Sequence, residues 1–356
     1  YNIRIGCYMI NLKEVYLAAT ESLELAHTSY RKAIKLKSGI DIRLTWINTD
    51  DFKAYASKNA GGKSFEISIS NGIIEFLFST AQICFSSPTN KIVEETMQLD
   101  AKFTDMKSLP AHDKDVYIER FVKITLMWIY FHELAHIIQD HNEIGNSVGC
   151  SLTGWDLSIE KVSISSEGAA DSTDAAVRHI FEFSADSEAT VQVIEFLTQT
   201  NDKHLVFKTD IWFLVLGVTS LFAFFYKGEL NTTRRIVSGT HPDANLRLRL
   251  IVVSIILYCG DLQKKYARVP WVENKKSVFN IVKPAFILAV MPVALQYENF
   301  DEQVFLRSVF AFDNGVDKYV NIICEQFKII RPIIIENYKG WSTAGVLNIR
   351  NPGILG

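Results

Sequence analysis

Residues 128–138 read WIYFHELAHII, and the pentad His132-Glu133-Leu134-Ala135-His136 lies inside this apolar run. The surrounding stretch, 113–141, has acidic residues near its start and apolar residues throughout, which predicts a helix. Residues four apart share a helical face, so His132 and His136 can direct both imidazoles at one metal ion. Glu133 follows the first histidine, where it can accept a proton from a metal-bound water. The pattern predicts a zinc centre; the alternative is two ordinary histidines on a buried helix.

Two histidines leave a catalytic zinc site unfinished, because such a site takes three protein ligands and one water. No further histidine follows at the metzincin spacing, so the third ligand must come from elsewhere. The next predicted helix, 172–197, carries Glu182 and Asp186 four residues apart on one face. Glu182 can bind the metal, while Asp186 can orient a ligand imidazole through a hydrogen bond to the ring nitrogen that does not bind the metal. The alternative is an acidic pair at the surface, which the apolar neighbours Ile180 and Val191 disfavour.

A third polar group lies at 240–247, which read THPDANLR. In a site with a zinc hydroxide, His241 and Arg247 could stabilise the oxyanion that forms when water adds to a peptide carbonyl. The alternative is a helix start with Pro242 at its first position and Arg247 exposed. Both interpretations stay open on the residues alone.

Two stretches alternate between apolar and polar residues with a period of two, at 41–48 and 65–70. Such alternation is typical of half-buried strands, and Asn59, Gly61 and Gly62 mark a turn between them. We therefore expect a small antiparallel sheet. The second strand either offers an edge to a substrate backbone or is a plain core strand.

Helical patterns account for most of the remaining chain, including its last hundred residues. The predicted helices cover 12–37, 73–85, 113–141, 172–197, 211–226 and 243–258. Residues 142–171 are rich in Gly, Ser and Asn and predict a loop, and the residues from Gly340 onward predict a loose tail. We place His141 at the end of its helix, where it complements the helix dipole.

These elements predict an α+β fold that is mainly helical: a zincin-like metalloprotease core with a small antiparallel sheet and a C-terminal helical region. The expected parts are an N-terminal subdomain at 1–110, a helical zinc-protease core at 111–260 and a helical region at 261–356. We expect them to pack as one compact unit.

Composition narrows the class of protein. The 356 residues are 48% hydrophobic and 22% charged, which excludes intrinsic disorder. A net charge of −3 shows no electrostatic footprint for nucleic acid. Five scattered cysteines predict free thiols in a reducing compartment, and the first 20 residues contain no apolar signal-peptide core. The apolar stretch 211–226 is shorter than a membrane span, so we expect a buried helix and no transmembrane segment. The prediction is a cytoplasmic protein.

The order of the three motifs, at 132–136, 182–186 and 241–247, resembles the gluzincin metallopeptidases of the M48 type. More specifically, Ala185-Asp186-Ser187 after the acidic residue is similar to the phage-exclusion proteases, the Lit or U49 peptidase family. The resemblance implies zinc bound by His132, His136 and Glu182, with Glu133 as the base. It further implies that Asp186 supports a ligand and that His241 with Arg247 contacts the scissile carbonyl.

The leading hypothesis is a zinc endopeptidase with one zinc ion per chain and a protein or peptide substrate. The resemblance implies a latent bacterial protease in anti-phage defence (abortive infection), which senses a phage-derived activator and cuts a host translation elongation factor. One alternative is a non-catalytic sensor or scaffold that keeps the zinc fold. Another is a membrane-associated M48-type protease anchored by 211–226. We expect a latent enzyme, whose substrate-binding groove is covered by the loop 142–171 or by the C-terminal region.

Overall fold

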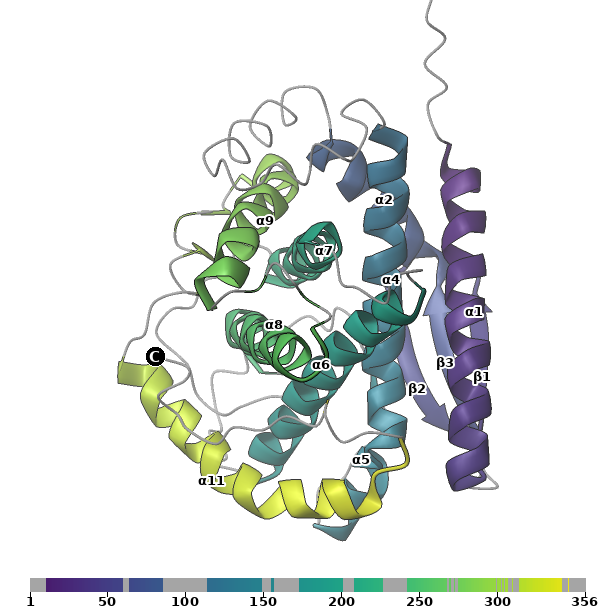
Figure 1. Ribbon diagram of the computed structural model, residues 1–356, viewed down its shortest axis with the longest axis vertical. Helices are drawn as coiled ribbons and strands as arrows, with labels where there is room; N and C mark the ends of the chain where they lie inside the picture. The colour runs from purple at the N-terminus through teal and green to yellow at the C-terminus, as the bar shows by residue number, and fades with distance from the viewer. Residues whose placement is uncertain are drawn as a thin grey trace, which may run out of the picture.

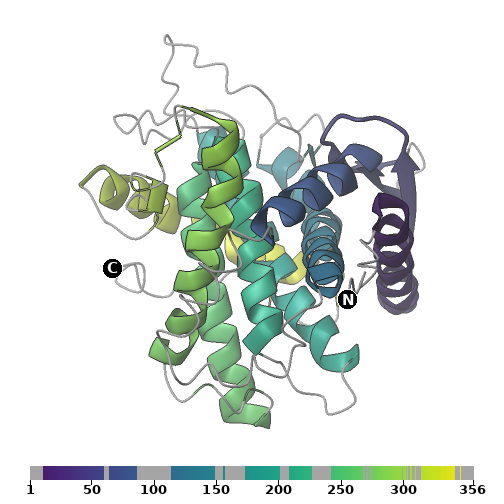
Figure 2. The same cartoon turned by 90° about the horizontal axis from the view of Figure 1, so that it is seen from above.

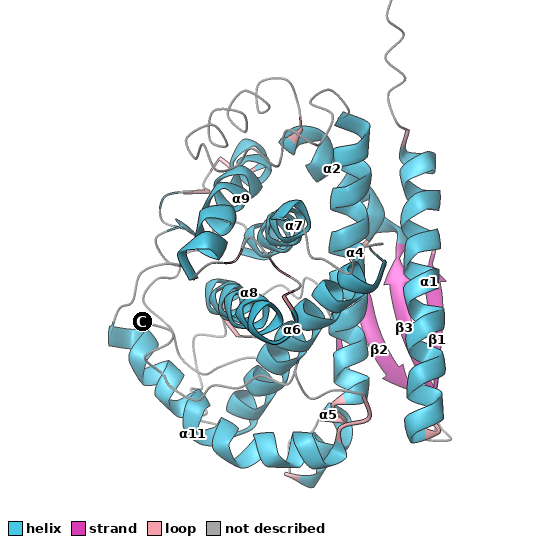
Figure 3. Ribbon diagram, in the orientation of Figure 1, coloured by secondary structure: helices cyan, strands magenta, loops and turns pink. Residues whose placement is uncertain are grey.

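The computed structural model describes most of the chain between Asn11 and Gly345. The described residues are 11–59, 64–85, 114–148, 155–156, 173–200, 208–226, 242–267, 269, 272, 275–298, 300–301, 303, 305–306, 309, 314–340 and 345. Helices dominate them, and the strands gather on one side of the molecule (Figure 3). The predicted mainly helical α+β fold is therefore confirmed.

The sheet is mixed, not antiparallel as predicted. It contains β1 (Asp41–Ile47), β2 (Ala54–Lys58), β3 (Ser64–Ser70) and β4 (Trp155–Asp156). The spatial order is β1-β3-β2-β4, with β1 parallel to β3 and β2 antiparallel to both β3 and β4. The prediction was wrong because β2, which reads AYASK, is short and has little strand propensity, yet it is the hairpin partner of β3. With partners on both sides, β3 is a core strand and offers no free edge to a substrate.

The long helix α1 (Leu12–Ser38) packs against β1 and against α4 (Lys114–Ile138). It begins at Asn11, whose side chain forms a capping box with Glu14, and it ends at Gly39 in the left-handed conformation. Figures 1 and 2 show α1 beside the strands at one side of the molecule, with α7 (Lys208–Tyr226), α8 (Ala244–Tyr266) and α9 (Lys275–Gln296) on the other.

The helix α4 is the centre of the core, and it contacts α1, α2 (Asn71–Cys84), α6 (Thr173–Thr200) and α7 (Lys208–Tyr226). Nearly every side chain from Phe121 to Ile138 is buried, which explains the apolar run of the sequence. The helix ends earlier than predicted, because Asp140 takes a left-handed conformation and a new helix, α5 (His141–Ser147), begins. Residues 141–147, predicted as a helix end and loop, are therefore helical, and the rest of that loop lies mostly outside the described residues.

Three described helices are long and apolar enough to cross a membrane by length and composition: α4, α7 and α9 (Lys275–Gln296). Their most apolar windows are 94%, 83% and 56% buried inside the fold, respectively. The stretch 211–226 is thus a buried helix here, as predicted. The absence of a transmembrane segment stays a prediction.

The C-terminal region is helical in its described parts, as predicted, with α8 (Ala244–Tyr266), α9 and α11 (Asn314–Asn337). The predicted loose tail is wrong at its start, because Gly340 and Gly345 are buried and the backbone N–H of Lys339 donates to the carbonyl of Ile138 at 2.7 Å. Buried apolar residues from Val15 to Tyr338 form one contiguous core. The division at 110 and 260 stays a prediction.

Candidate metal centre

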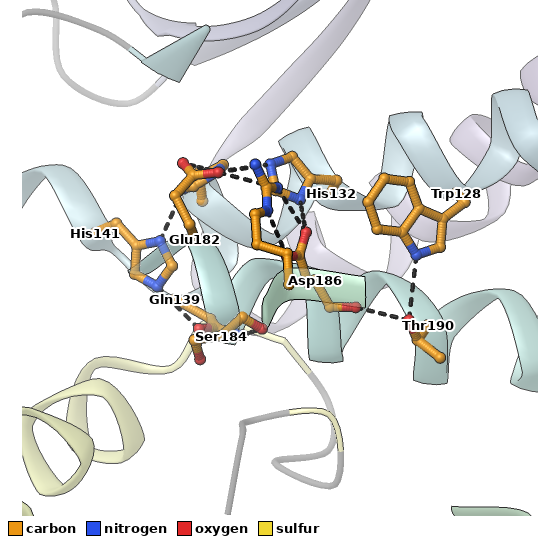
Figure 4. A network of polar contacts seen from close by, with 10 residues as sticks. Trp128, His132, Gln139, His141, Glu182, Ser184, Asp186 and Thr190 are labelled. Carbon is orange, nitrogen blue, oxygen red and sulfur yellow. Dashed lines mark hydrogen bonds and ion pairs between the residues drawn. The ribbon is translucent and has the colours of Figure 1, made fainter. Parts of the chain in front are cut away.

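The two histidines of the pentad and an acidic residue of α6 meet where α4 packs on α6 (Figure 4). The Nε2 atoms of His132 and His136 are 3.2 Å apart. The Glu182 carboxylate faces both of them, with Oε2 3.6 Å from His132 Nε2 and Oε1 3.5 Å from His136 Nε2. One candidate ligand atom from each residue lies within 4.8 Å of the others. His136 and Glu182 lie 46 positions apart along the chain, yet they direct their donor atoms toward the same point.

This donor set fits a zinc ion. Two imidazole nitrogens and a carboxylate oxygen are the donors that catalytic zinc takes from proteins, and a fourth position is left for water. All three side chains are at most 3% exposed, so their polar atoms are withdrawn from solvent and turned toward one another. A buried cluster of this kind is costly unless its polar groups are paired or bind a metal. His132, His136 and Glu182 would hold the ion.

A second set of contacts fixes the orientation of His132. Its Nδ1 lies 3.0 Å from Asp186 Oδ1, and a carboxylate at this distance favours the tautomer with its proton on Nδ1, which leaves Nε2 for a metal. The guanidinium of Arg247 binds the same carboxylate in a fork, with Nε 2.8 Å from Oδ2 and Nη2 2.7 Å from Oδ1. Arg247 Nη2 also lies 3.1 Å from Glu182 Oε2. One arginine thus holds both a candidate ligand and the carboxylate behind another ligand.

The opposite charges of Asp186 and Arg247 stabilise each other. Burial opposes ionisation of Asp186, but Arg247 and His132 outweigh it and hold the pKa of this carboxyl below its usual range. Burial likewise opposes the charge of Arg247, while Asp186 and Glu182 raise its pKa further. Asp186 is therefore a carboxylate and Arg247 a guanidinium cation at any physiological pH.

Glu133 is fully buried beside the ligand histidine, on the same turn of α4. Its negative charge is among those that raise the pKa of Arg247, the residue that also binds Asp186 and Glu182. A carboxyl group next to candidate metal ligands is of a type that can exchange protons with water.

Aromatic rings pack around the polar group. Trp128 stacks on His132 with ring centroids 5.5 Å apart, and its indole N–H donates to Thr190 at 3.2 Å. The Arg247 guanidinium lies 4.9 Å from the centroid of the Phe222 ring. These contacts exclude water from the back of the site and fix the rotamers of His132 and Arg247.

The structure thus brings together His132, Glu133, His136, Glu182, Asp186 and Arg247 from three helices. His241 lies outside the described residues. The helix start predicted near Pro242 is present, but Asp243 caps it by accepting from the backbone N–H groups of Asn245 and Leu246. Arg247 is 4% exposed, so the interpretation that placed it at the surface is wrong.

Sequence reasoning missed the part played by His141. Its Nδ1 lies 2.9 Å from His136 Nδ1, and its Nε2 lies 2.9 Å from the side-chain oxygen of Gln139. The ring stacks on Phe181 with centroids 4.4 Å apart. Burial, followed by the charge of His132, lowers the pKa of His141 well below its usual value, so this imidazole is neutral. No spacing in the sequence signals this contact, because residues nine apart lie on opposite faces of a regular helix and His141 reaches His136 through the turn at Asp140.

Comparison with known proteins agrees with this site. Residues 88–257 match the model of the family described as Peptidase U49. The matched segment contains α4, α6, α7 and the start of α8, and hence every residue of the candidate centre. No curated protein and no solved structure matches the chain. This match supports a relationship to the U49 peptidase family and therefore the conclusion that the chain is a peptidase.

Proposed function

We propose that this protein is a zinc-dependent endopeptidase of the HExxH type, with the gluzincin ligand set His132, His136 and Glu182. The observation that carries the proposal is the convergence of these three buried side chains, with Glu133 beside them, inside the segment that matches a peptidase family. The motif order of the M48-type peptidases supports the same conclusion.

Each residue of the centre has a chemical task in this proposal. Zinc in such a donor set supplies Lewis acidity, which lowers the pKa of a water and stabilises negative charge on a peptide oxygen. Glu133 accepts the proton of the attacking water and passes it to the departing amine. Asp186 keeps the proton of His132 on Nδ1, so that Nε2 is available as a ligand.

The roles of His241 and Arg247 rest on the resemblance, which places both at the scissile carbonyl. The contacts of Arg247 with Asp186 and Glu182 favour a different task, namely holding these two carboxylates in place. We therefore assign the oxyanion contact to His241 and a positioning role to Arg247.

We infer further that the protein is latent in this conformation. His132, Glu133, His136 and Glu182 are each at most 3% exposed, and a polypeptide needs its carbonyl beside these groups to be cut. The substrate can reach them only after a movement of the covering chain. A partner drives such a movement only if it binds the open state more tightly than the closed one.

The resemblance to phage-exclusion proteases supports a phage-derived protein or peptide as this partner, and a host protein such as a translation elongation factor as the substrate. The role would be abortive infection. Cys84, Cys259 and Cys324 are buried free thiols, which supports a reducing compartment and hence the cytoplasm.

Two alternative functions have less support than the peptidase. A non-catalytic scaffold has no chemical need of the Glu133 carboxyl, which is buried beside the three candidate ligands and is not one of them. A membrane-associated protease is favoured by α9 alone, whose apolar window is only 56% buried. Co-sedimentation of the protein with lipid vesicles would support the second alternative.

The test of the proposed function is cleavage in bacterial lysates. We expect the purified protein to generate discrete products in a phage-infected lysate and none in an uninfected lysate. A zinc chelator should abolish the products, and added zinc should restore them, because the reaction depends on the ion. Products can be followed by gel and mass spectrometry.

The outcomes separate activity from latency. Rapid digestion of unstructured casein by the protein alone would contradict latency while leaving the peptidase in place. Cleavage that persists in full after chelation would contradict the zinc mechanism.

A further inference from the structure

A hydrogen-bonded network runs from the back of His136 to the C-terminal segment of the chain. Its members are His136, His141, Gln139, Ser184, Glu188, Gln192 and Tyr338, which we call the His141 network. Each of these side chains is buried. Figure 4 shows its first part, with His141, Gln139 and Ser184 on the side of the centre away from Trp128. The peptidase chemistry proposed above does not use the network beyond His136.

The direction of every donor in the network follows from the position of His136. Its Nε2 faces His132 and Glu182, so the proton of the neutral ring belongs on Nδ1. That Nδ1–H then donates to His141 Nδ1 at 2.9 Å. His141 in turn carries its proton on Nε2 and donates to the side-chain oxygen of Gln139 at 2.9 Å.

The same direction continues to the buried carboxyl group of Glu188. The oxygen of Gln139 also accepts from the Ser184 hydroxyl at 2.6 Å, which fixes the orientation of the amide. The amide nitrogen of Gln139 therefore donates to Glu188 Oε2 at 3.2 Å. Glu188 accepts two further hydrogen bonds, from Gln192 at 2.5 Å and from the Tyr338 hydroxyl at 2.8 Å. The donors of His136, His141 and Gln139 thus lead from the candidate metal centre to Glu188, where Gln192 and Tyr338 donate from the other side.

The C-terminal segment closes the far end of the network. Tyr338 follows α11, and the next residue, Lys339, is fixed to the end of α4 through the carbonyl of Ile138 and the carboxylate of Asp140. Gly345 packs directly on Glu188, because a Cβ at this glycine would lie 2.5 Å from Glu188 Oε2. Residues at least 150 positions after Glu188 in the sequence therefore enclose the carboxyl group that ends the network.

We propose that His141 is a positioning residue that aims His136 at the metal, and that Tyr338 holds the far end of the His141 network at Glu188. The proposal rests on the proposed function, since it concerns a ligand of the zinc centre. His132 is oriented by a carboxylate, Asp186. His136 instead has a neutral imidazole behind it, and the network connects that imidazole to the carboxylate of Glu188.

The test is the zinc affinity of folded variants, measured by competition with a chromophoric chelator. His141→Phe keeps a ring that can stack on Phe181 but offers no acceptor to His136. Because loss of an outer hydrogen-bond partner typically weakens metal binding about 10–100-fold, we expect a loss of this size. His141→Asn places an amide oxygen near the former Nδ1 and should recover most of the affinity. The visible spectrum of the cobalt-substituted protein should change in His141→Phe and remain near wild type in His141→Asn.

Tyr338→Phe removes one hydroxyl at the other end of the network and is the milder variant. It should weaken zinc binding less than His141→Phe does. Its matched control is Tyr16→Phe, which removes a hydroxyl that bonds Asn71 outside the network and should leave zinc affinity unchanged. A purely structural role would lower the melting temperature of the metal-free variants without altering the cobalt spectrum.

The outcomes distinguish this proposal from the proposed function. A wild-type protein that binds no zinc overturns both. If the wild type binds zinc and folded His141→Phe binds it equally well, the positioning role is overturned and the metal centre stands. If His141→Phe fails to fold, the other two variants carry the test. Unchanged zinc affinity and an unchanged cobalt spectrum in Tyr338→Phe would overturn the role assigned to the C-terminal segment. Weaker zinc binding in Tyr338→Phe, together with unchanged affinity in His141→Asn, would support that role.

Discussion

Glu133→Gln should retain zinc and the wild-type melting temperature while cleavage slows by about 10²- to 10⁴-fold, the usual contribution of a general base. The amide has the shape of the carboxyl but cannot accept the proton of the attacking water. Glu133 is fully buried next to a ligand histidine, so the substitution also removes no surface contact. The rate is measured on whichever protein the wild type cleaves, with zinc content determined on the same preparations.

The matched control is Glu119→Gln, which makes the same chemical change on the same helix. Glu119 is partly exposed and pairs with Lys123 one turn later, away from the centre. This variant should cleave at the wild-type rate. Substantial turnover by Glu133→Gln would remove Glu133 from the role of base.

Arg247→Met should lower the free energy of unfolding by about 3–5 kcal/mol, the cost of leaving a buried charge without its partner. In wild type the Arg247 guanidinium pairs with the carboxyl groups of both Asp186 and Glu182. The substitution would leave these two buried groups without that cation. Zinc binding should weaken as well, since the carboxylate that orients His132 loses its anchor. Urea denaturation of the metal-free proteins measures the first effect, and chelator competition measures the second.

The chain contains a matched control for this change. Arg31 binds Asp41 with a similar fork, at 2.9 and 3.1 Å, but the Arg31 side chain is 42% exposed. Arg31→Met should therefore cost only about 0–1 kcal/mol. Equal losses for the two variants would show that burial of the Arg247 pair is not what makes it important.

The centre itself could be predicted from sequence because its geometry is mostly local. The spacing of four in His132 and His136, and again in Glu182 and Asp186, places each pair on one helical face whatever the rest of the fold does. Apolar neighbours indicated that both helices are buried, and a shared metal ion is the reason to expect that they pack on each other. The structure brings all four side chains together, while their roles stay predictions.

The remaining features depend on contacts between distant segments, which no local pattern encodes. The strand β2 is five residues long, and its place between β3 and β4 is set by tertiary pairing. His141 reaches His136 only because Asp140 takes a left-handed conformation and redirects the chain into α5. Tyr338 meets Glu188 across 150 positions of sequence, and Gly345 packs on the same side chain, so the prediction of a loose tail from Gly340 onward was wrong at its start.

The most direct test of the account is the zinc-to-protein ratio of the purified wild type and of Glu182→Ala, measured by elemental analysis. Two imidazoles and a carboxylate form a complete protein ligand set for catalytic zinc, and two imidazoles alone do not. We predict one zinc ion per chain in the wild type and nearly none in a folded Glu182→Ala variant. A wild type without zinc, or undiminished zinc in Glu182→Ala, would contradict the centre described here.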